Sequence, residues 1–159
     1  MGLDRTDLLI LHLLQQDGRR TNVEVAEEVA LSASPCLRRI KKLEETNVIR
    51  GYRAIIDRDA VGLGLTVIVE IKVGRHSKEN ARVLQAALVA IPEVVACHMI
   101  SGAADFIAEV VVKDLKAYEQ LLTDKLLVLD MIEDIRSNFS LRRIKSDAPL
   151  PLPVENPKA

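Results

Sequence analysis

The chain has 159 residues, with 22 basic and 23 acidic side chains and a formal net charge of −1. Hydrophobic residues make up 48% and charged residues 28%. This composition excludes an intrinsically disordered chain and is typical of a folded protein with one domain or two small ones. Near-neutrality taken alone argues against a nucleic-acid-binding protein, because such proteins usually carry a basic excess.

Three amphipathic helices are predicted in the first 50 residues. Side chains that can accept hydrogen bonds from free helix amides precede each of them. The expected caps are Asp4 with Asp7 in a capping box, Thr21 or Asn22, and Ser32. The third helix is expected to run to about Thr46. Its apolar residues recur at i, i+4 and i+7, which predicts a single buried face made of Cys36, Ile40 and Leu43.

The second half of the chain alternates between strand and helix patterns. Strands are predicted at residues 65–73, 94–100, 105–112 and 132–144. Ser77 and Asp114 are expected to cap the two intervening helices, and Pro92 ends the first of them. The inward face of the second helix is expected to contain Leu115, Tyr118, Leu122 and Leu126. The order β-α-β-β-α-β predicts a ferredoxin-like arrangement, so the whole chain is expected to be an α+β protein.

The second and third helices are separated by a short link, a spacing typical of a helix-turn-helix DNA-binding unit. Ser34 and Arg38 are expected one turn apart on the outer face of the third helix. Six basic and two acidic residues lie between positions 35 and 53, a local charge of +4. Because aromatic residues are scarce, DNA contacts would depend on charge and hydrogen bonds. The candidate DNA-contacting residues are Ser32, Ser34, Pro35, Arg38, Arg39, Lys41, Lys42 and Arg53.

Within this set, Ser34, Arg38 and Arg39 are expected at or near base edges, and Lys41, Lys42 and Arg53 at phosphates. The predicted organisation is a helix-turn-helix domain at 1–50, an extended hinge at 51–64, a βαββαβ domain at 65–146 and a proline-rich tail at 147–159. The tail is expected to be extended.

Four segments make the likeness to a known family specific. They are residues 3–7, 14–20, 31–40 and 48–52, and they resemble the Lrp/AsnC family of bacterial and archaeal transcription regulators. The resemblance implies a DNA-binding domain followed by a ligand-sensing domain, assembly into homodimers and often octamers, and an amino acid or related molecule as effector. One departure is Ala30, where the family commonly has glycine. A left-handed alanine costs roughly 1 kcal/mol, so some strain is expected in the turn.

The hairpin between the two central strands of the second domain contains Ser101-Gly102-Ala103-Ala104-Asp105, which resembles the family's Gly-x-x-Asp effector motif. The Asp105 carboxylate could accept hydrogen bonds from a ligand ammonium group. The alternative is a tight turn in which Asp105 bonds to its own backbone. The candidate effector-binding residues are Met99, Ser101, Gly102, Ala103, Ala104 and Asp105.

Other classes of function have less support in the sequence. No catalytic constellation, zinc-site spacing or phosphate-binding loop is present, so neither an enzyme nor a metal or cofactor site is expected. No signal peptide or membrane-spanning run is found, and Cys36 and Cys97 are expected as free thiols, which fits a cytoplasmic protein. One alternative remains, an amino-acid-sensing regulatory subunit of a metabolic enzyme that does not bind DNA.

Overall fold

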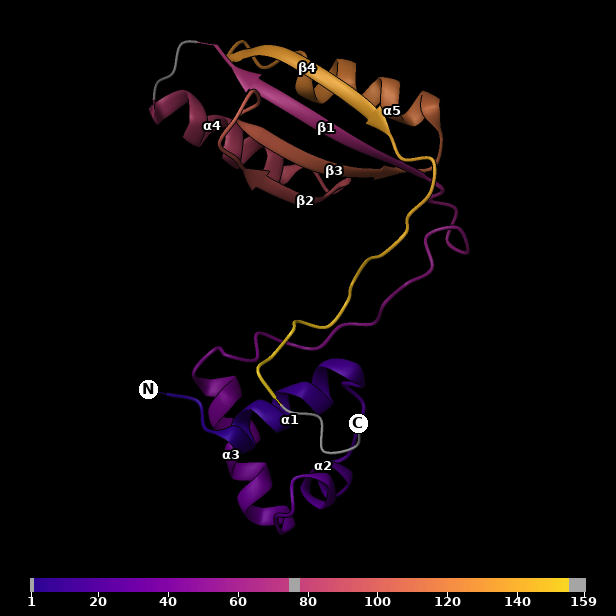
Figure 1. Ribbon diagram of the computed structural model, residues 1–159. Coiled ribbons are helices and arrows are strands. Elements are labelled where there is room, and N and C mark those ends of the chain that lie inside the picture. The colour runs from indigo at the N-terminus through magenta and orange to yellow at the C-terminus, as the bar shows by residue number, and fades with distance from the viewer. Residues whose placement is uncertain (1, 75–77, 155–159) are drawn as a thin grey trace. The chain divides into compact units, whose positions relative to one another are not determined.

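The computed structural model describes residues 2–74 and 78–154 and divides into two compact units (Figure 1). The first unit contains Met1–Ile55 together with the C-terminal segment from Lys145, and the second contains Ile56–Ile144. The boundary at Ile55 lies within the extended segment expected at 51–64. The described part of the tail does not stand apart, because it belongs to the first unit.

The first unit is built on three helices, α1 (Arg5–Gln16), α2 (Asn22–Glu28) and α3 (Ala33–Glu45). Capping boxes begin α1, with Asp4 and Asp7, and α2, with Thr21 and Glu24, which confirms these two predicted starts. The helices pack around a small aliphatic core. Its buried members are Ile10, Leu14, Val25, Ala26, Cys36, Ile40 and Leu43, which include the predicted face of α3.

Ser32 precedes α3 in extended conformation, but its side chain makes no capping hydrogen bond. The prediction of a side-chain cap is therefore wrong, although the predicted start of the helix is right. A capping serine usually bonds to the amide of the second or third helical residue. Here the third helical residue is Pro35, which has no N–H to donate.

The link between α2 and α3 reverses the chain through a left-handed residue. Ala30 has φ +53°, and the Leu31 amide donates to the Ala26 carbonyl at 2.9 Å, while the Ala30 amide donates to the Glu27 carbonyl at 3.3 Å. These two bonds form a Schellman motif, which normally has glycine at the left-handed position. The expected strain at Ala30 is therefore present in the turn.

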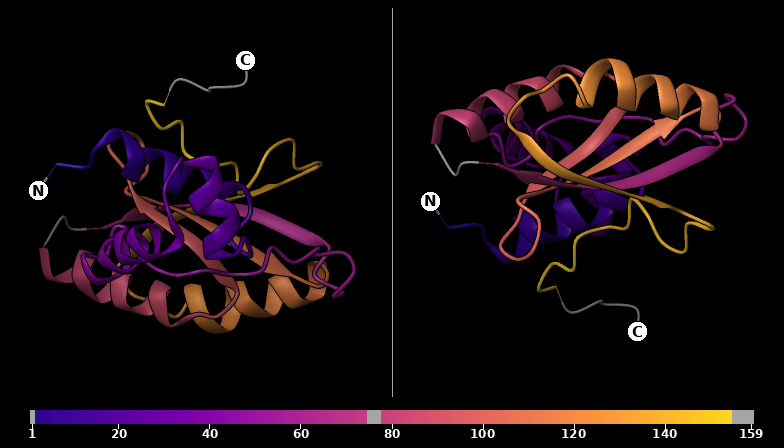
Figure 2. Two further views of the ribbon diagram at one scale, coloured as in Figure 1. Left: turned by 90° about the horizontal axis from the view of Figure 1, so that it is seen from below. Right: turned by 90° about the horizontal axis from the view of Figure 1, so that it is seen from above.

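The second unit is a four-stranded antiparallel sheet whose two helices cover one face (Figure 2). Its elements are β1 (Leu65–Val73), α4 (Lys78–Ala90), β2 (Val94–Met99), β3 (Phe106–Val112), α5 (Leu115–Leu121), the π-helical turn η1 (Leu122–Leu126) and β4 (Ile132–Phe139). The sheet order β2-β3-β1-β4 confirms the predicted ferredoxin-like arrangement. Asp114 caps α5 as predicted, whereas the expected cap Ser77 lies outside the described residues.

Strict alternation along β1 decides which face of the sheet is covered. Val67, Val69, Ile71 and Val73 are buried, while the residues between them are half-buried. Successive strand side chains point to opposite faces, so the apolar set lies beneath the helices and Glu70 and Lys72 lie on the other face. The buried core beneath the helices also includes Leu84, Leu88, Ile91, Phe106, Val110, Val112, Tyr118, Leu121 and Leu126.

Two details of the second unit differ from the predictions. Of the residues predicted to face inward, Leu115 is 63% exposed, Tyr118 and Leu126 are buried, and Leu122 is half-buried against the core. Leu121, which was not predicted, is also buried. The π-helical turn η1 places one extra residue in that turn, so regular 3.6-residue spacing fails there.

The last strand also ends earlier than predicted, at Phe139 rather than at residue 144. Phe139 pairs with Val67, and the Ser140 amide donates to the Thr66 carbonyl at 3.0 Å. Since β1 begins at Leu65, only that one residue of β1 remains beyond Thr66, too few to pair with a strand that continues to residue 144.

Candidate nucleic-acid interface and effector site

The face of α3 opposite its buried residues is polar and basic. Ser34, Arg38, Lys41 and Lys42 are all exposed, as the spacing predicts, and Pro35 is half-buried. Among the ion pairs of residues 2–74 and 78–154, none involves Arg38, Lys41 or Lys42. A row of cations with no ion pair in that part of the chain, on a helix that follows a tight turn, is suited to the phosphates and base edges of a DNA groove.

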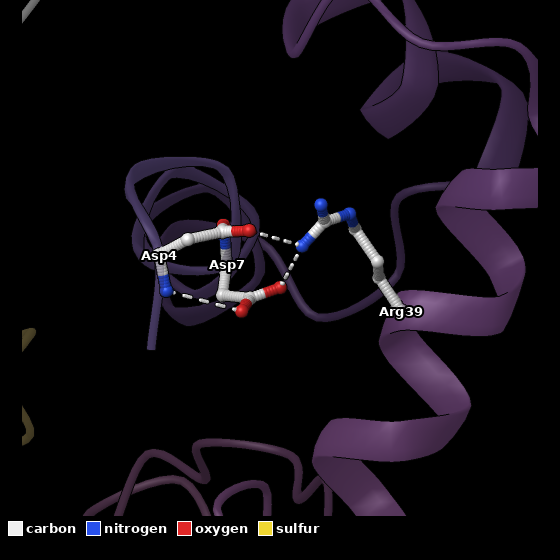
Figure 3. Close-up of polar contacts among 3 residues, drawn as sticks. All are labelled: Asp4, Asp7 and Arg39. Atoms are coloured by element: carbon white, nitrogen blue, oxygen red, sulfur yellow. Dashed lines mark hydrogen bonds and ion pairs between the residues drawn. The ribbon is translucent and has the colours of Figure 1, made fainter. Parts of the chain in front are cut away.

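Arg39 lies differently from its neighbours (Figure 3). Its Nη1 atom is 2.7 Å from Asp4 Oδ2 and 2.7 Å from Asp7 Oδ1, so the guanidinium bridges both carboxylates of the α1 capping box. The pKa of Asp4 is lowered, first by the hydrogen bond from the Asp7 amide and then by the bond from Arg39. The hydrogen bonds to Asp7 and Asp4 raise the pKa of Arg39.

This arrangement changes the interpretation of Arg39. The sequence predicts a contact at or near DNA bases, but the structure uses the side chain to hold α3 against the start of α1. Helical spacing places residues 38 and 39 about 100° apart, so Arg38 projects outward where Arg39 does not. The ion pairs give Arg39 a role in positioning α3, and its contact with DNA stays a prediction.

Arg53 follows α3 in the extended chain and is 84% exposed. Its Nη2 atom is 3.0 Å from the Oδ1 atom of Asp147, which belongs to the C-terminal segment of the same unit. The predicted phosphate contact therefore has an acidic partner within the protein. No sequence pattern indicates this pairing, because the two residues are 94 positions apart.

The β2–β3 hairpin positions the predicted effector residues in the second unit. Met99 and the loop residues Ser101, Gly102 and Ala103 are exposed, and Ala104 is half-buried. Gly102 has φ +143°, a conformation that side chains rarely adopt, which explains glycine at this position. The hairpin thus brings the predicted residues together at one end of the sheet.

Asp105 is bonded to the neighbouring strand rather than only within its own hairpin. Its Oδ2 atom accepts a hydrogen bond from the Val73 amide at 2.8 Å, and its own amide donates to the Ile71 carbonyl at 3.0 Å. The Ile100 amide donates to the Asp105 carbonyl at 2.9 Å. These bonds fix the hairpin to β1. This positioning role differs from both roles considered from the sequence, which were a carboxylate that binds ligand and a tight turn in which Asp105 bonds to its own backbone.

A cavity of about 300 Å³ lies between the hairpin and the sheet face that the helices leave uncovered. It is lined by Glu70, Lys72, Ala103, Ala104, Asp134 and Arg136. In the strand register Glu70 lies opposite Arg136 and Lys72 lies opposite Asp134, so acidic and basic groups alternate at its floor. These four charged residues are not among the predicted site residues, although charges at alternate positions of an apolar strand are a detectable signal.

The two cysteines have the features of structural rather than reactive residues. Cys36 is buried and Cys97 half-buried, both as free thiols, and burial raises the pKa of each, which keeps them in the unreactive protonated form. Within the described residues, no three His, Cys, Asp or Glu side chains gather to hold a metal ion. No helix in that part of the chain is long and apolar enough to cross a membrane.

The geometry defines a class of protein: a helix-turn-helix unit with a free basic face, joined to a ferredoxin-like unit with a small charged cavity. Family comparisons agree with this division. Residues 3–50 match the family described as winged helix-turn-helix DNA-binding, and residues 66–150 match the Lrp/AsnC ligand binding domain.

Individual relatives extend the likeness over almost the whole chain. The leucine-responsive regulatory protein of Rhizobium meliloti is 38% identical over 143 residues, covering 90% of this chain and 92% of the relative. The Bkd operon transcriptional regulator of Pseudomonas aeruginosa is 35% identical over 150 residues, covering 94% and 98%. The crystal structure of a Neisseria meningitidis transcriptional regulator in complex with L-Met has TM-score 0.88 and 38% identity, covering 94% and 97%.

The chain belongs to the Lrp/AsnC family of DNA-binding transcriptional regulators. This confirms the predicted family, the fold class and the function as a regulator with an effector-binding domain. The match of the first unit to a DNA-binding domain favours this function over the alternative of an enzyme's regulatory subunit.

Proposed function

We propose that this regulator reads its DNA site through the exposed face of α3. Ser34 and Arg38 contact base edges, and Lys41, Lys42 and Arg53 contact phosphates. Ser32 and Pro35 begin the helix at the DNA surface. The observation that carries this assignment is the contrast on α3 between Arg39, which is paired with two carboxylates, and Arg38, which has no ion pair in the described structure.

The second unit is proposed to bind an amino acid in the cavity beneath the β2–β3 hairpin. An amino acid carries an ammonium and a carboxylate, and the alternating charges of Glu70, Lys72, Asp134 and Arg136 offer a partner to each. A cavity of about 300 Å³ is sufficient for a molecule of this size. The related Neisseria structure, solved with L-Met, supports an amino acid as the effector class.

Within this proposal the predicted hairpin residues have two roles. Met99, Ser101, Gly102, Ala103 and Ala104 form the rim, where exposed loop groups can close over the ligand. Asp105 holds the rim in place through the Val73 amide. The two alanines leave space for an apolar side chain.

We further propose that the protein acts in the cytoplasm as a homodimer that assembles into an octamer. A two-fold dimer would present two α3 helices to successive major grooves of a pseudo-palindromic site. Effector binding regulates transcription if its affinity differs between two assemblies, which changes the placement of the DNA-binding units.

The effector proposal is tested by titrating a panel of amino acids into the protein by isothermal calorimetry, with DNA affinity measured in parallel by fluorescence anisotropy. At least one amino acid should bind and shift DNA affinity. Arg136→Ala should weaken that binding, while Arg143→Ala, which removes an exposed cation outside the cavity, should leave it unchanged. Equal affinity in wild type and Arg136→Ala would refute the site.

A further inference from the structure

The C-terminal segment of the first unit, residues 145–154, has a defined local structure. Pro149, Pro151 and Pro153 have no N–H, so few backbone donors remain. The Leu152 amide donates to the Leu150 carbonyl and the Val154 amide to the Leu152 carbonyl, both at 2.8 Å. Pro151 and Pro153 thus each lie at the centre of a three-residue turn.

The segment docks on α1 through one side chain. Gln15 Nε2 donates to the Leu150 carbonyl and Gln15 Oε1 accepts from the Leu150 amide, each at 2.9 Å. The amide group thereby bonds both backbone groups of one residue, as a neighbouring strand would. Beyond this point Leu152 and Val154 are half-buried. The contact recognises extended backbone and anchors the segment to the DNA-binding unit.

The same segment also contacts the predicted DNA interface. Asp147, which lies three residues before Leu150, has its Oδ1 atom 3.0 Å from Arg53 Nη2. A DNA phosphate would use this guanidinium in the same way, because both are oxyanions. Arg53 is 84% exposed, so its pairing with Asp147 is weak enough to be exchanged.

We propose that residues 145–154 act as an internal competitor of DNA: docked on α1 through Gln15, the segment places Asp147 on Arg53, and bound DNA displaces it. The inference rests on the proposed contact between Arg53 and a DNA phosphate. The segment begins where the second unit ends, after residues 140–144 that follow β4, so a change in that unit reaches the DNA-binding unit through this segment as well as through the hinge.

Docking is measured by hydrogen exchange of the Leu150 amide in the full-length protein. Exchange should be slow in wild type and faster in Gln15→Ala. The matched control is Gln16→Ala, which removes a neighbouring amide that bonds to His12 instead, and its exchange should resemble wild type. Saturating DNA should speed Leu150 exchange in wild type. Unchanged or slower exchange with DNA bound would overturn the competition while leaving DNA binding intact.

Measurements of DNA affinity provide a second test of the competition. Gln15→Ala and Asp147→Asn should each tighten binding by about two- to fivefold at low salt, the range of a lost surface ion pair. Asp147→Asn in an Arg53→Ala background should have no effect. An equal gain in that background would mean a general charge effect and would overturn the proposal. If wild type and Gln15→Ala both fail to bind DNA, the proposed function fails together with this inference.

Discussion

Replacing Ala30 by glycine should stabilise the DNA-binding unit. Ala30 occupies the left-handed position of the Schellman motif between α2 and α3 at φ +53°. The left-handed conformation costs an L-residue about 1 to 2 kcal/mol, a cost that glycine avoids. Glycine also makes the unfolded chain more flexible, which lowers the free energy of unfolding by up to about 1 kcal/mol. Ala30 is exposed, so loss of its methyl group removes no core contact. The net expected gain is about 1 kcal/mol.

Native-state hydrogen exchange of α2 and α3 measures this gain within the first unit itself. About 1 kcal/mol corresponds to roughly fivefold slower exchange of the amides that open only by unfolding of the unit. Asn47→Gly is the matched control, because Asn47 has φ +56° in the equivalent position after α3 and asparagine tolerates that conformation. Its gain should be smaller. Equal or faster exchange in Ala30→Gly would refute the strain argument.

Three further predictions concern paired side chains. Arg39→Ala should lower the thermal midpoint of the first unit by a few degrees, because α3 loses its ion pairs with α1; an unchanged midpoint would remove its positioning role. The hydrogen bond from Lys125 lowers the pKa of Glu93, so this pair stabilises the fold above the unfolded-state pKa, and the contribution is lost as pH falls through the lower folded-state pKa. The thermal midpoint should therefore decline less steeply between about pH 7 and pH 3 in Glu93→Gln than in wild type. Parallel curves for the two proteins would contradict this. Asp105→Ala should speed exchange of the Val73 amide and weaken effector binding indirectly, whereas an unaltered Val73 amide would argue against its role in fixing the hairpin.

Much of the fold was predictable because its determinants are local. Caps and turns such as Asp4 with Asp7, or Ala30, depend on residues a few positions apart, and strand alternation decides which face of β1 is buried. The candidate DNA-binding face of α3 follows from helical spacing alone. The absence of a side-chain cap at Ser32 was also predictable from the sequence, since Pro35 occupies the third helical position and has no backbone N–H to donate.

The features that were missed depend on contacts between distant segments or on irregular backbone. Arg39 looks like its neighbours in sequence, and only packing of α3 against α1 shows that it faces two carboxylates. The π-helical turn after Leu121 shifts the buried face without a sequence signal. Docking of the tail on Gln15 joins residues 135 positions apart, far beyond the range of local patterns.

The most direct test of the central claim is a fluorescence anisotropy titration on DNA upstream of the protein's own coding region, at several salt concentrations. Wild type should bind with an affinity that falls steeply with salt, and Arg38→Ala should bind about tenfold or more weakly. Lys116→Ala, which removes an exposed cation from the second unit, should bind like wild type. Equal binding by wild type and Arg38→Ala would contradict the assignment of α3 as the helix that reads DNA.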